Sequence, residues 1–301
     1  MKRTAGLELT SVAVIALTLA LAGLAAAQEQ APAPAAKSQV PASQPSGRAP
    51  VQAKTQEEYQ AYQAAVANAQ NAAAMEKSAD EFAAKFPASD LRVLLYRAAM
   101  QSYQTAGDSP KMLNMGLKVL AVDKDDPEAL IGVAEVLEEQ TSNTDLDKDQ
   151  RMNRAVTFSQ HALETIDTDL AVPAGSPPQR VEAYKRYLRA TAFAIVGTIQ
   201  YKREQYADAE GNLRKAIDAD PDNPDPVVIL RLALALDQQK KYPEALQQAN
   251  RAVALTQDST DAGKMARNER DRLVLVTGGS NAPTAPASPS AGSQAPAPPS
   301  H

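Results

Sequence analysis

The pattern of apolar positions between residues 193 and 255 occurs twice along the chain. Phe193 and Ile229 occupy corresponding places, 36 residues apart, and each is followed by further apolar residues at helical spacing. Each copy then passes through a polar turn and continues with a second helical pattern, which opens at Tyr206 or Tyr242. A period of this length, with helical spacing in both halves, predicts helix pairs that stack on one another.

The two copies share small residues where antiparallel helices would have to approach closely, and larger ones such as Leu213 and Leu232 would fill the grooves between helices. The second helices open in the similar phrases "EQYADAEGNL" and "KKYPEALQQA". The small residues are Gly197, Ala209 and Ala216 in the first copy, and Ala233, Ala245 and Ala252 in the second.

These features resemble the tetratricopeptide repeat, a helix–turn–helix unit of about 34 residues. Pro221 matches the proline that often follows the family's second helix. The chain departs from the family at Gln200 and Leu236, where a tyrosine is usual, and at Gln257, which replaces the second proline. The resemblance covers 193–255 and implies an all-α fold, a right-handed solenoid of antiparallel helix pairs.

Helical spacing also continues upstream and downstream of these two copies. It predicts a hairpin from about Gln56 to Pro87, a second formed by 91–105 and 109–122, and a third that opens at Pro127. The second helix of the third hairpin is expected from Arg151, after a longer acidic loop. We interpret this loop as solvated, because Asp145, Asp147 and Asp149 lack the glycine and the final glutamate of a calcium-binding hand.

A long helix is predicted from about Pro178 to Glu204, and a final helix from Asp261 to Val276. The basic residues in the first half of the long helix are interpreted as a solvated face: Arg180, Lys185, Arg186 and Arg189. The final helix is expected to cap the stack with its charged face outward. Its inward residues would be Met265, Ala266, Leu273 and Val276.

The first 27 residues have the layout of a secretory signal peptide. Lys2 and Arg3 precede an apolar run from Ser11 to Leu24, and three alanines end at Ala27. An uncleaved membrane anchor is the alternative, because the apolar run is nearly long enough to span a bilayer. Either way we expect export, to the periplasm or the extracellular space.

Two segments flank the helical region and have a similar composition. Residues 28–54 and 278–301 are rich in proline, alanine and serine or glutamine, with almost no large apolar side chain. Such segments cannot bury enough surface to offset the entropy of ordering, so we expect disordered tails on either side of a helical repeat domain over 55–277.

Composition narrows the range of functions. The chain has no cysteine, which excludes disulfides, a thiol nucleophile and a lipid-modified cysteine. The formal net charge is -5, so nothing in the charge balance indicates nucleic acid or an anionic membrane surface as the partner.

No group of residues predicts catalysis. His161 and His301 are the two histidines, and the sequence has no glycine-rich phosphate loop and no nucleophile motif. We therefore expect no cofactor, no metal and no enzymatic activity. An enzyme acting on envelope glycans through paired carboxylates remains the alternative, and it would require a deep pocket with a carboxylate of raised pKa.

The family resemblance implies a concave groove lined by the first helix of each pair. Carried onto this chain, the groove positions are Arg97, Gln101 and Gln104, then Glu128, Ile131, Glu135, Glu138 and Glu139, then Thr198, Tyr201 and Lys202, and finally Val227, Leu230, Leu234 and Asp237. The middle of this groove is acidic, whereas the helix "PVVILRLALAL" is apolar all around.

Two interpretations of that apolar helix are open. The C-terminal helix covers Val227, Leu230 and Leu234, or these residues form an open groove for a partner's amphipathic segment. The sequence thus predicts an interaction scaffold of a bacterial cell envelope. Its partner would be a protein of unknown identity, with apolar residues at one end and basic residues toward Glu135 to Glu139. Self-association through the last repeat is a further alternative.

Overall fold

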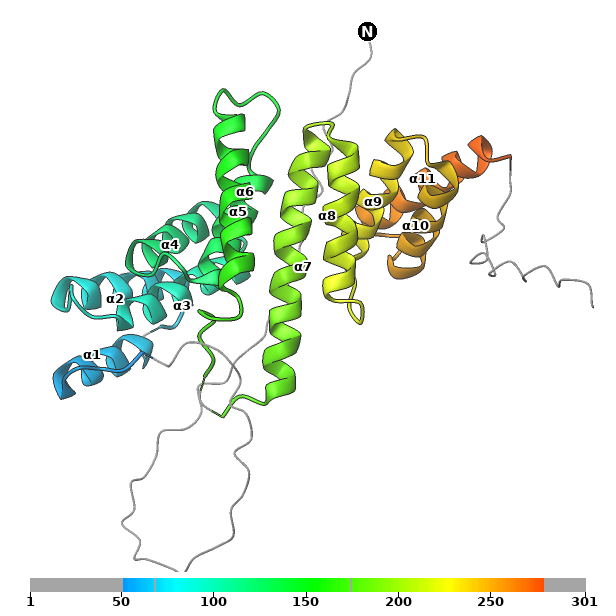
Figure 1. Ribbon diagram of the computed structural model, residues 1–301. Helices are drawn as coiled ribbons and strands as arrows, with labels where there is room; N and C mark the ends of the chain where they lie inside the picture. The colour runs from blue at the N-terminus through cyan, green and yellow to red at the C-terminus, as the bar shows by residue number, and fades with distance from the viewer. Residues whose placement is uncertain (1–50, 68, 174, 279–301) are drawn as a thin grey trace, which may run out of the picture.

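The computed structural model describes residues 51–67, 69–173 and 175–278, and within these ranges all regular elements are α-helices. They are α1 (Gln56–Ala67), α2 (Ala72–Lys85), α3 (Leu91–Ala106), α4 (Ser109–Val122), α5 (Pro127–Glu139), α6 (Lys148–Thr165), α7 (Pro178–Lys202), α8 (Tyr206–Ala219), α9 (Pro226–Gln238), α10 (Tyr242–Leu255) and α11 (Asp261–Val276). The predicted all-α fold is confirmed (Figure 1).

None of these helices is long and apolar enough to cross a membrane. The predicted signal peptide over 1–27 lies outside the described residues. So do the predicted tails, except for residues 51–54 and residue 278.

Local side chains set where several helices begin. At the start of α5, Asp126 Oδ1 accepts a hydrogen bond from the backbone N of Ala129, with the two atoms 2.8 Å apart. At the start of α9, Asp225 Oδ1 accepts one from the backbone N of Val227 at 2.7 Å. A proline follows each cap, where it removes no helical hydrogen bond. These starts are therefore encoded in the adjacent residues.

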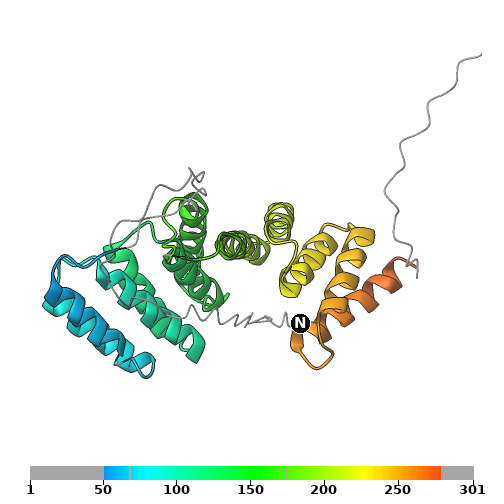
Figure 2. The ribbon, with the colours of Figure 1, turned by 90° about the horizontal axis from the view of Figure 1, so that it is seen from below.

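The helices pack as successive hairpins, and the hairpins form two layers. The first helices of neighbouring pairs contact each other, as α1 does α3, α5 does α7, and α7 does α9. Second helices meet through long side chains, as in the ion pairs of Lys118 in α4 with Asp80 in α2 and of Arg214 in α8 with Glu244 in α10. The first helices thus form the inner layer of a curved stack and the second helices the outer layer, which Figure 2 shows as an arc.

Small residues lie where the helices approach most closely. A Cβ atom added to Gly197 of α7 would lie 2.8 Å from Leu213 Cγ of α8, and one added to Gly116 of α4 would lie 2.6 Å from Val133 Cγ2 of α5. Real Cβ atoms do not approach other carbons this closely, so these contacts require glycine. The alanines predicted at close contacts, from Ala209 to Ala252, are all buried.

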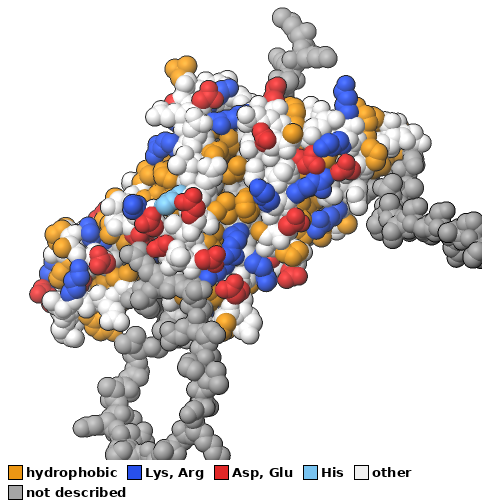
Figure 3. All heavy atoms as spheres, in the orientation of Figure 1, with side chains coloured by type: hydrophobic (Ala, Val, Ile, Leu, Met, Phe, Trp, Pro, Cys, Tyr) orange, Lys and Arg blue, Asp and Glu red, His pale blue; other side chains and the backbone are white. Residues whose placement is uncertain are grey.

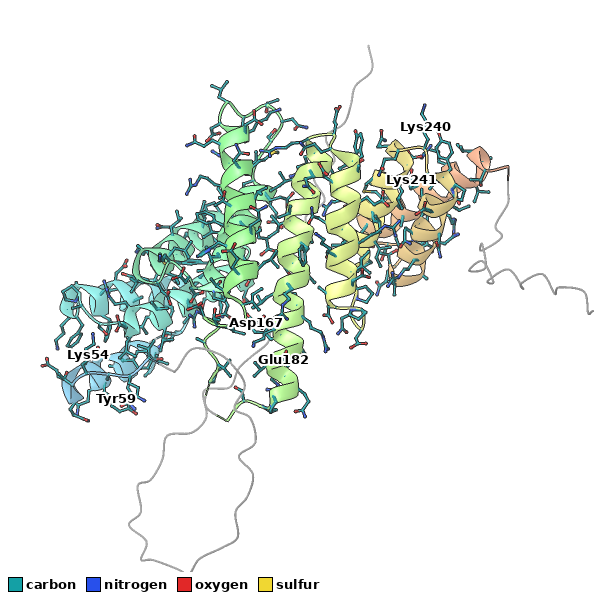
Figure 4. All side chains as sticks on the ribbon, in the orientation of Figure 1. Lys54, Tyr59, Asp167, Glu182, Lys240 and Lys241 are labelled. Atoms are coloured by element: carbon teal, nitrogen blue, oxygen red, sulfur yellow. The ribbon has the colours of Figure 1, made fainter. Side chains whose placement is uncertain are left out.

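The basic side of α7 differs from the prediction. Lys185 is 1% exposed in its side chain, with Nζ 3.3 Å from Asp167 Oδ1 and 3.6 Å from Glu182 Oε1. Figure 4 labels both carboxylates beside the first half of α7. Arg189 also pairs with Asp167, and Arg186 with Asp220. The interpretation of this face as solvated was wrong for Lys185, because the loop after α6 folds against it, whereas Arg180 is exposed as expected.

Two details at helix ends also differ. Helix α6 begins at Lys148, about one turn before the predicted Arg151. In α11, Ala266 and Leu273 are buried as predicted, but Val276 is 48% exposed because it lies in the last turn, beyond the helices that α11 covers. The acidic loop before α6 is ordered by Arg151, which pairs with Asp147 at 2.8 Å.

Candidate functional site

The inner layer collects most of the residues that the sequence assigned to a groove. Arg97 and Gln101 come from α3, the four glutamates from α5, Tyr201 and Lys202 from α7, and Val227, Leu230 and Leu234 from α9. Because α5, α7 and α9 contact one another in series, their inward side chains meet on one face. We call this face the inner face.

At one end of the inner face, predicted groove residues pair with each other. Arg97 Nε lies 3.0 Å from Glu128 Oε2, and the Arg97 guanidinium also bonds to Asp126, the cap of α5. The side chains of Arg97 and Glu128 are each 11% exposed. The Tyr184 hydroxyl of α7 donates to Glu128. Arg97 and Glu128 therefore join α3, α5 and α7, while Gln101 remains exposed.

Further along, cations of α7 and α9 hold the inner helices together. Lys202 Nζ lies 2.7 Å from Glu138 Oε1 and donates to the backbone oxygen of Glu138 at 2.8 Å. Arg231 Nη1 of α9 donates to Thr198 Oγ1 of α7 at 2.8 Å. The charge of Lys202 is thus already paired with Glu138 within the protein.

Glu135 and Glu139 form the centre of the inner face, and no ion pair of the described residues includes either one. Burial raises the pKa of Glu135 to about 8, with further contributions from the negative charges of Glu139, Glu138 and Asp225. Burial and Glu138 also raise the pKa of Glu139, although Lys202 and Arg231 partly oppose the change. Glu135 is therefore mostly protonated at neutral pH in the free protein, and the centre holds two carboxyl groups whose ionised forms pair with no cation among the described residues.

Two aromatic residues beside this centre were missed by sequence reasoning. Tyr184 and Tyr187 stack with ring centroids 6.1 Å apart and an angle of 15° between the rings. The pKa of the Tyr187 hydroxyl is raised by burial and by Glu135, which places that carboxylate near the ring. The repeat pattern assigned groove positions only in the second half of α7. The sequence signal that could have placed Tyr184 on an inward face of α7 was its helical spacing with Leu188.

The apolar end of the inner face is largely filled by the protein itself. Leu230 is 1% exposed and belongs to a core cluster that includes Ala266 and Leu273 of α11. Leu234 and Tyr201 are partly buried against the same cluster, and Val227 is partly buried. The interpretation in which the C-terminal helix covers this region fits Leu230, which is buried in the same cluster as residues of α11.

An enzyme would need a hollow beside its carboxylates. Two hollows of about 420 and 310 Å3 lie on the described surface, both lined by residues of α6. Neither of these two is lined by Glu135, Glu138 or Glu139. Glu135 has the raised pKa that a general acid requires, but these hollows do not place a substrate beside it.

Comparison with known proteins supports the repeat assignment. Residues 200–268 match the model of the tetratricopeptide repeat family. No curated protein matches the chain.

Two solved structures are similar to this chain. One is a thermophilic TPR protein of Thermus thermophilus, with 16% identity and a TM-score of 0.41, covering 72% of this chain and 99% of that one. The other is the assembly chaperone of RpL4 (Acl4), residues 1–338, with 14% identity and a TM-score of 0.40, covering 73% of this chain and 97% of that one.

Proposed function

We propose that this tetratricopeptide repeat protein is a non-catalytic interaction scaffold, which holds a segment of a partner protein on its inner face. The repeat match and the layered stack support a surface for protein contacts in general. Solenoids of this kind present an extended concave surface because only the first helices line it. The partner's identity does not follow from the fold.

One observation indicates where on the inner face the partner would bind. Arg97 is paired with Glu128 and Lys202 with Glu138, whereas Glu135 and Glu139 have no ion pair with any described residue. A lysine or arginine of the partner would stabilise the ionised forms of both carboxyl groups and pair with them, and Tyr187 beside Glu135 offers an aromatic surface for the same cation. We therefore propose a partner segment with at least one basic side chain, bound across α5 and α7.

The cellular location is part of the same proposal and is supported by the sequence alone. The basic start, apolar run and alanines of residues 1–27 favour export to the periplasm or beyond, in a bacterial cell envelope. Mass determination of the native protein's N-terminus tests this. A chain that begins after Ala27 supports export with cleavage, a chain that retains its first residues in a membrane fraction supports the anchored alternative, and a full-length cytosolic chain contradicts export.

Selection of random peptides against the purified full chain tests the binding surface. We expect the wild type to enrich peptides that contain lysine or arginine, and Glu135→Gln with Glu139→Gln to weaken their binding by about tenfold or more, as for loss of a charge pair. Circular dichroism confirms that the variant remains folded. Enrichment of peptides without basic residues would contradict the proposed chemistry.

A matched control separates this site from general charge effects. Glu81→Gln with Glu164→Gln removes the same charge from exposed positions on α2 and α6. The control should bind the selected peptides as the wild type does. Equal weakening by both double variants would show that net charge alone governs binding, and the inner face would then not be the site.

A further inference from the structure

The connection between α5 and α6 differs from the other turns within hairpins. It runs from 140 to 147, whereas α3 and α4 are separated only by 107–108, and α9 and α10 by 239–241. Helix α6 is also longer than α4, with 18 residues against 14. The loop and the first turn of α6 consequently project beyond the neighbouring helices in Figure 1. Hairpin packing does not require this projection.

The projecting loop is ordered, yet it exposes a leucine completely. Asp145 Oδ2 accepts a hydrogen bond from the backbone N of Ser142 at 3.0 Å, and Asp147 pairs with Arg151 at 2.8 Å. These contacts hold the loop on both sides of Leu146, whose relative exposure is 107%. A fully exposed leucine on an ordered loop gains nothing from burial within the monomer.

A hollow lies at the base of this loop, and Asp147, the residue after Leu146, is part of its lining. It has a volume of about 310 Å3 and an apolar wall of Leu113, Val136 and Leu137. The volume is several times the roughly 30 Å3 that one water occupies in the liquid, so a leucine side chain fits. A larger hollow of about 420 Å3 continues along α6 past Arg154 to Phe158.

We propose that the occupant of this hollow is Leu146 of a second copy of the chain. A projecting apolar side chain next to an apolar hollow is self-complementary under two-fold symmetry, because each copy's leucine fills the other copy's hollow in one isologous contact. The projection lets two copies approach at this end without collision between their solenoids. This inference is independent of the binding function proposed for the inner face.

The charged side chains near the projecting loop are also compatible with a contact between two identical surfaces. Arg154 contacts the ring of Phe158 at 5.8 Å, and neither Arg154 nor the Asp149 carboxylate takes part in an ion pair among the described residues. Figure 3 shows a hydrophobic side chain at the tip of the projection, with acidic and basic side chains just below it. Because both signs are present, a symmetric pairing has a cation and a carboxylate on each copy that are available to pair with each other.

Sedimentation of the full chain tests the proposal. The contact is smaller than a standard interface, so we expect a weak dimer with a Kd on the order of 1–100 µM. The mean mass of the wild type should rise toward that of a dimer between about 1 and 200 µM, and Leu146→Asp should stay monomeric at every concentration. Leu146 is fully exposed in the monomer, so its substitution should leave the fold intact.

Leu275→Asp is the matched control, because Leu275 is 82% exposed at the far end of the solenoid. It should dimerise as the wild type does. A wild type that stays monomeric, or dimers that persist in Leu146→Asp, would overturn the proposal. Loss of dimers in Leu275→Asp alone would move the contact to the last helices, which also overturns it.

Cross-linking gives a second, positional readout, and the absence of cysteine from the chain makes introduced cysteines unique. Leu146→Cys mixed with a tagged Gln150→Cys should form a mixed disulfide, because Gln150 lines both hollows. Leu146→Cys mixed with a tagged Leu275→Cys should give several-fold less. Equal yields of the two mixed products would contradict the proposed arrangement.

Discussion

Glu204 and Lys240 adopt the same left-handed backbone conformation, with φ of 61° and 62°, at positions 36 residues apart. Each lies in the turn between the two helices of a repeat, and Figure 4 shows Lys240 at such a turn. In the α3–α4 turn the corresponding conformation belongs to Gly107, with φ of 70°. Only glycine adopts this conformation without a steric cost, so two of the three turns are strained.

Glycine at either strained turn should stabilise the protein. Glu204→Gly and Lys240→Gly each remove the steric cost of a left-handed backbone conformation, although glycine also increases the conformational entropy of the unfolded chain. We expect a net gain of about 0.5 kcal/mol per site in the free energy of unfolding by urea. Gly107→Ala should lose about 1 kcal/mol. Destabilisation by Lys240→Gly would show that the turn conformation is not strained.

Removal of Arg97 should be strongly destabilising. Arg97→Met leaves Asp126 and Glu128 without their cation, and the Asp126 side chain is fully buried. A buried charge that loses its partner costs about 3–5 kcal/mol in the free energy of unfolding. Lys118→Met is the control, because Lys118 and Asp80 form a half-exposed pair at 2.6 Å. That change should cost less than about 1 kcal/mol. Similar costs for both would contradict a structural role for Arg97.

The pKa of Glu135 gives a pH dependence with a definite sign. Folding raises this pKa to about 8, so the folded chain binds the proton more tightly than the unfolded chain, where it is about 4.3. The resulting stabilisation is fully present below about pH 4.3 and is lost as the pH rises through about 8.

Glu135→Gln should therefore be more stable than the wild type at about pH 9, by about 1–3 kcal/mol after allowance for solvent screening, and nearly equal to it at about pH 4. Unfolding by urea at each pH measures the difference. Direct titration of Glu135 by NMR is the independent check, and a midpoint near its ordinary value would contradict the prediction.

The close approach of α7 and α8 should make Gly197 sensitive to a single methyl group. Gly197→Ala places a Cβ 2.8 Å from Leu213 Cγ and 3.1 Å from the Leu213 backbone N, which should cost about 1–3 kcal/mol in the free energy of unfolding. Gly211→Ala is the control within α8, where an added Cβ meets nothing within 4 Å. That change should instead stabilise by about 0.5–1 kcal/mol. A neutral Gly197→Ala would show that the two helices can separate at little cost.

Most helix boundaries could be predicted because they depend on neighbouring residues. The bounds Ser109–Val122 and Asp261–Val276 were predicted without error, since caps and prolines mark their starts. The start of α6 was missed because its extra turn, from Lys148, has no side-chain cap.

The candidate site could be predicted only in part. Repeat spacing placed Glu135, Glu138 and Glu139 on the inner face, because position within a helix decides which way a side chain points. It could not show that Lys202 reaches Glu138 from α7, a contact that joins residues 64 positions apart. Nor could it show that Tyr187 lies near Glu135, because the first half of α7 falls outside the repeat pattern.

The sequence by itself determined the helical repeat, its close-packed positions and the acidic character of the inner face. These properties follow from residue spacing and residue type, which act over one or two helical turns. Only the tertiary structure decided which charges are neutralised and which apolar residues are covered. Whether Glu135 is ionised or Leu230 is buried depends on distances between helices that are far apart in the chain. The energy of a charge or of an apolar side chain depends on those surroundings.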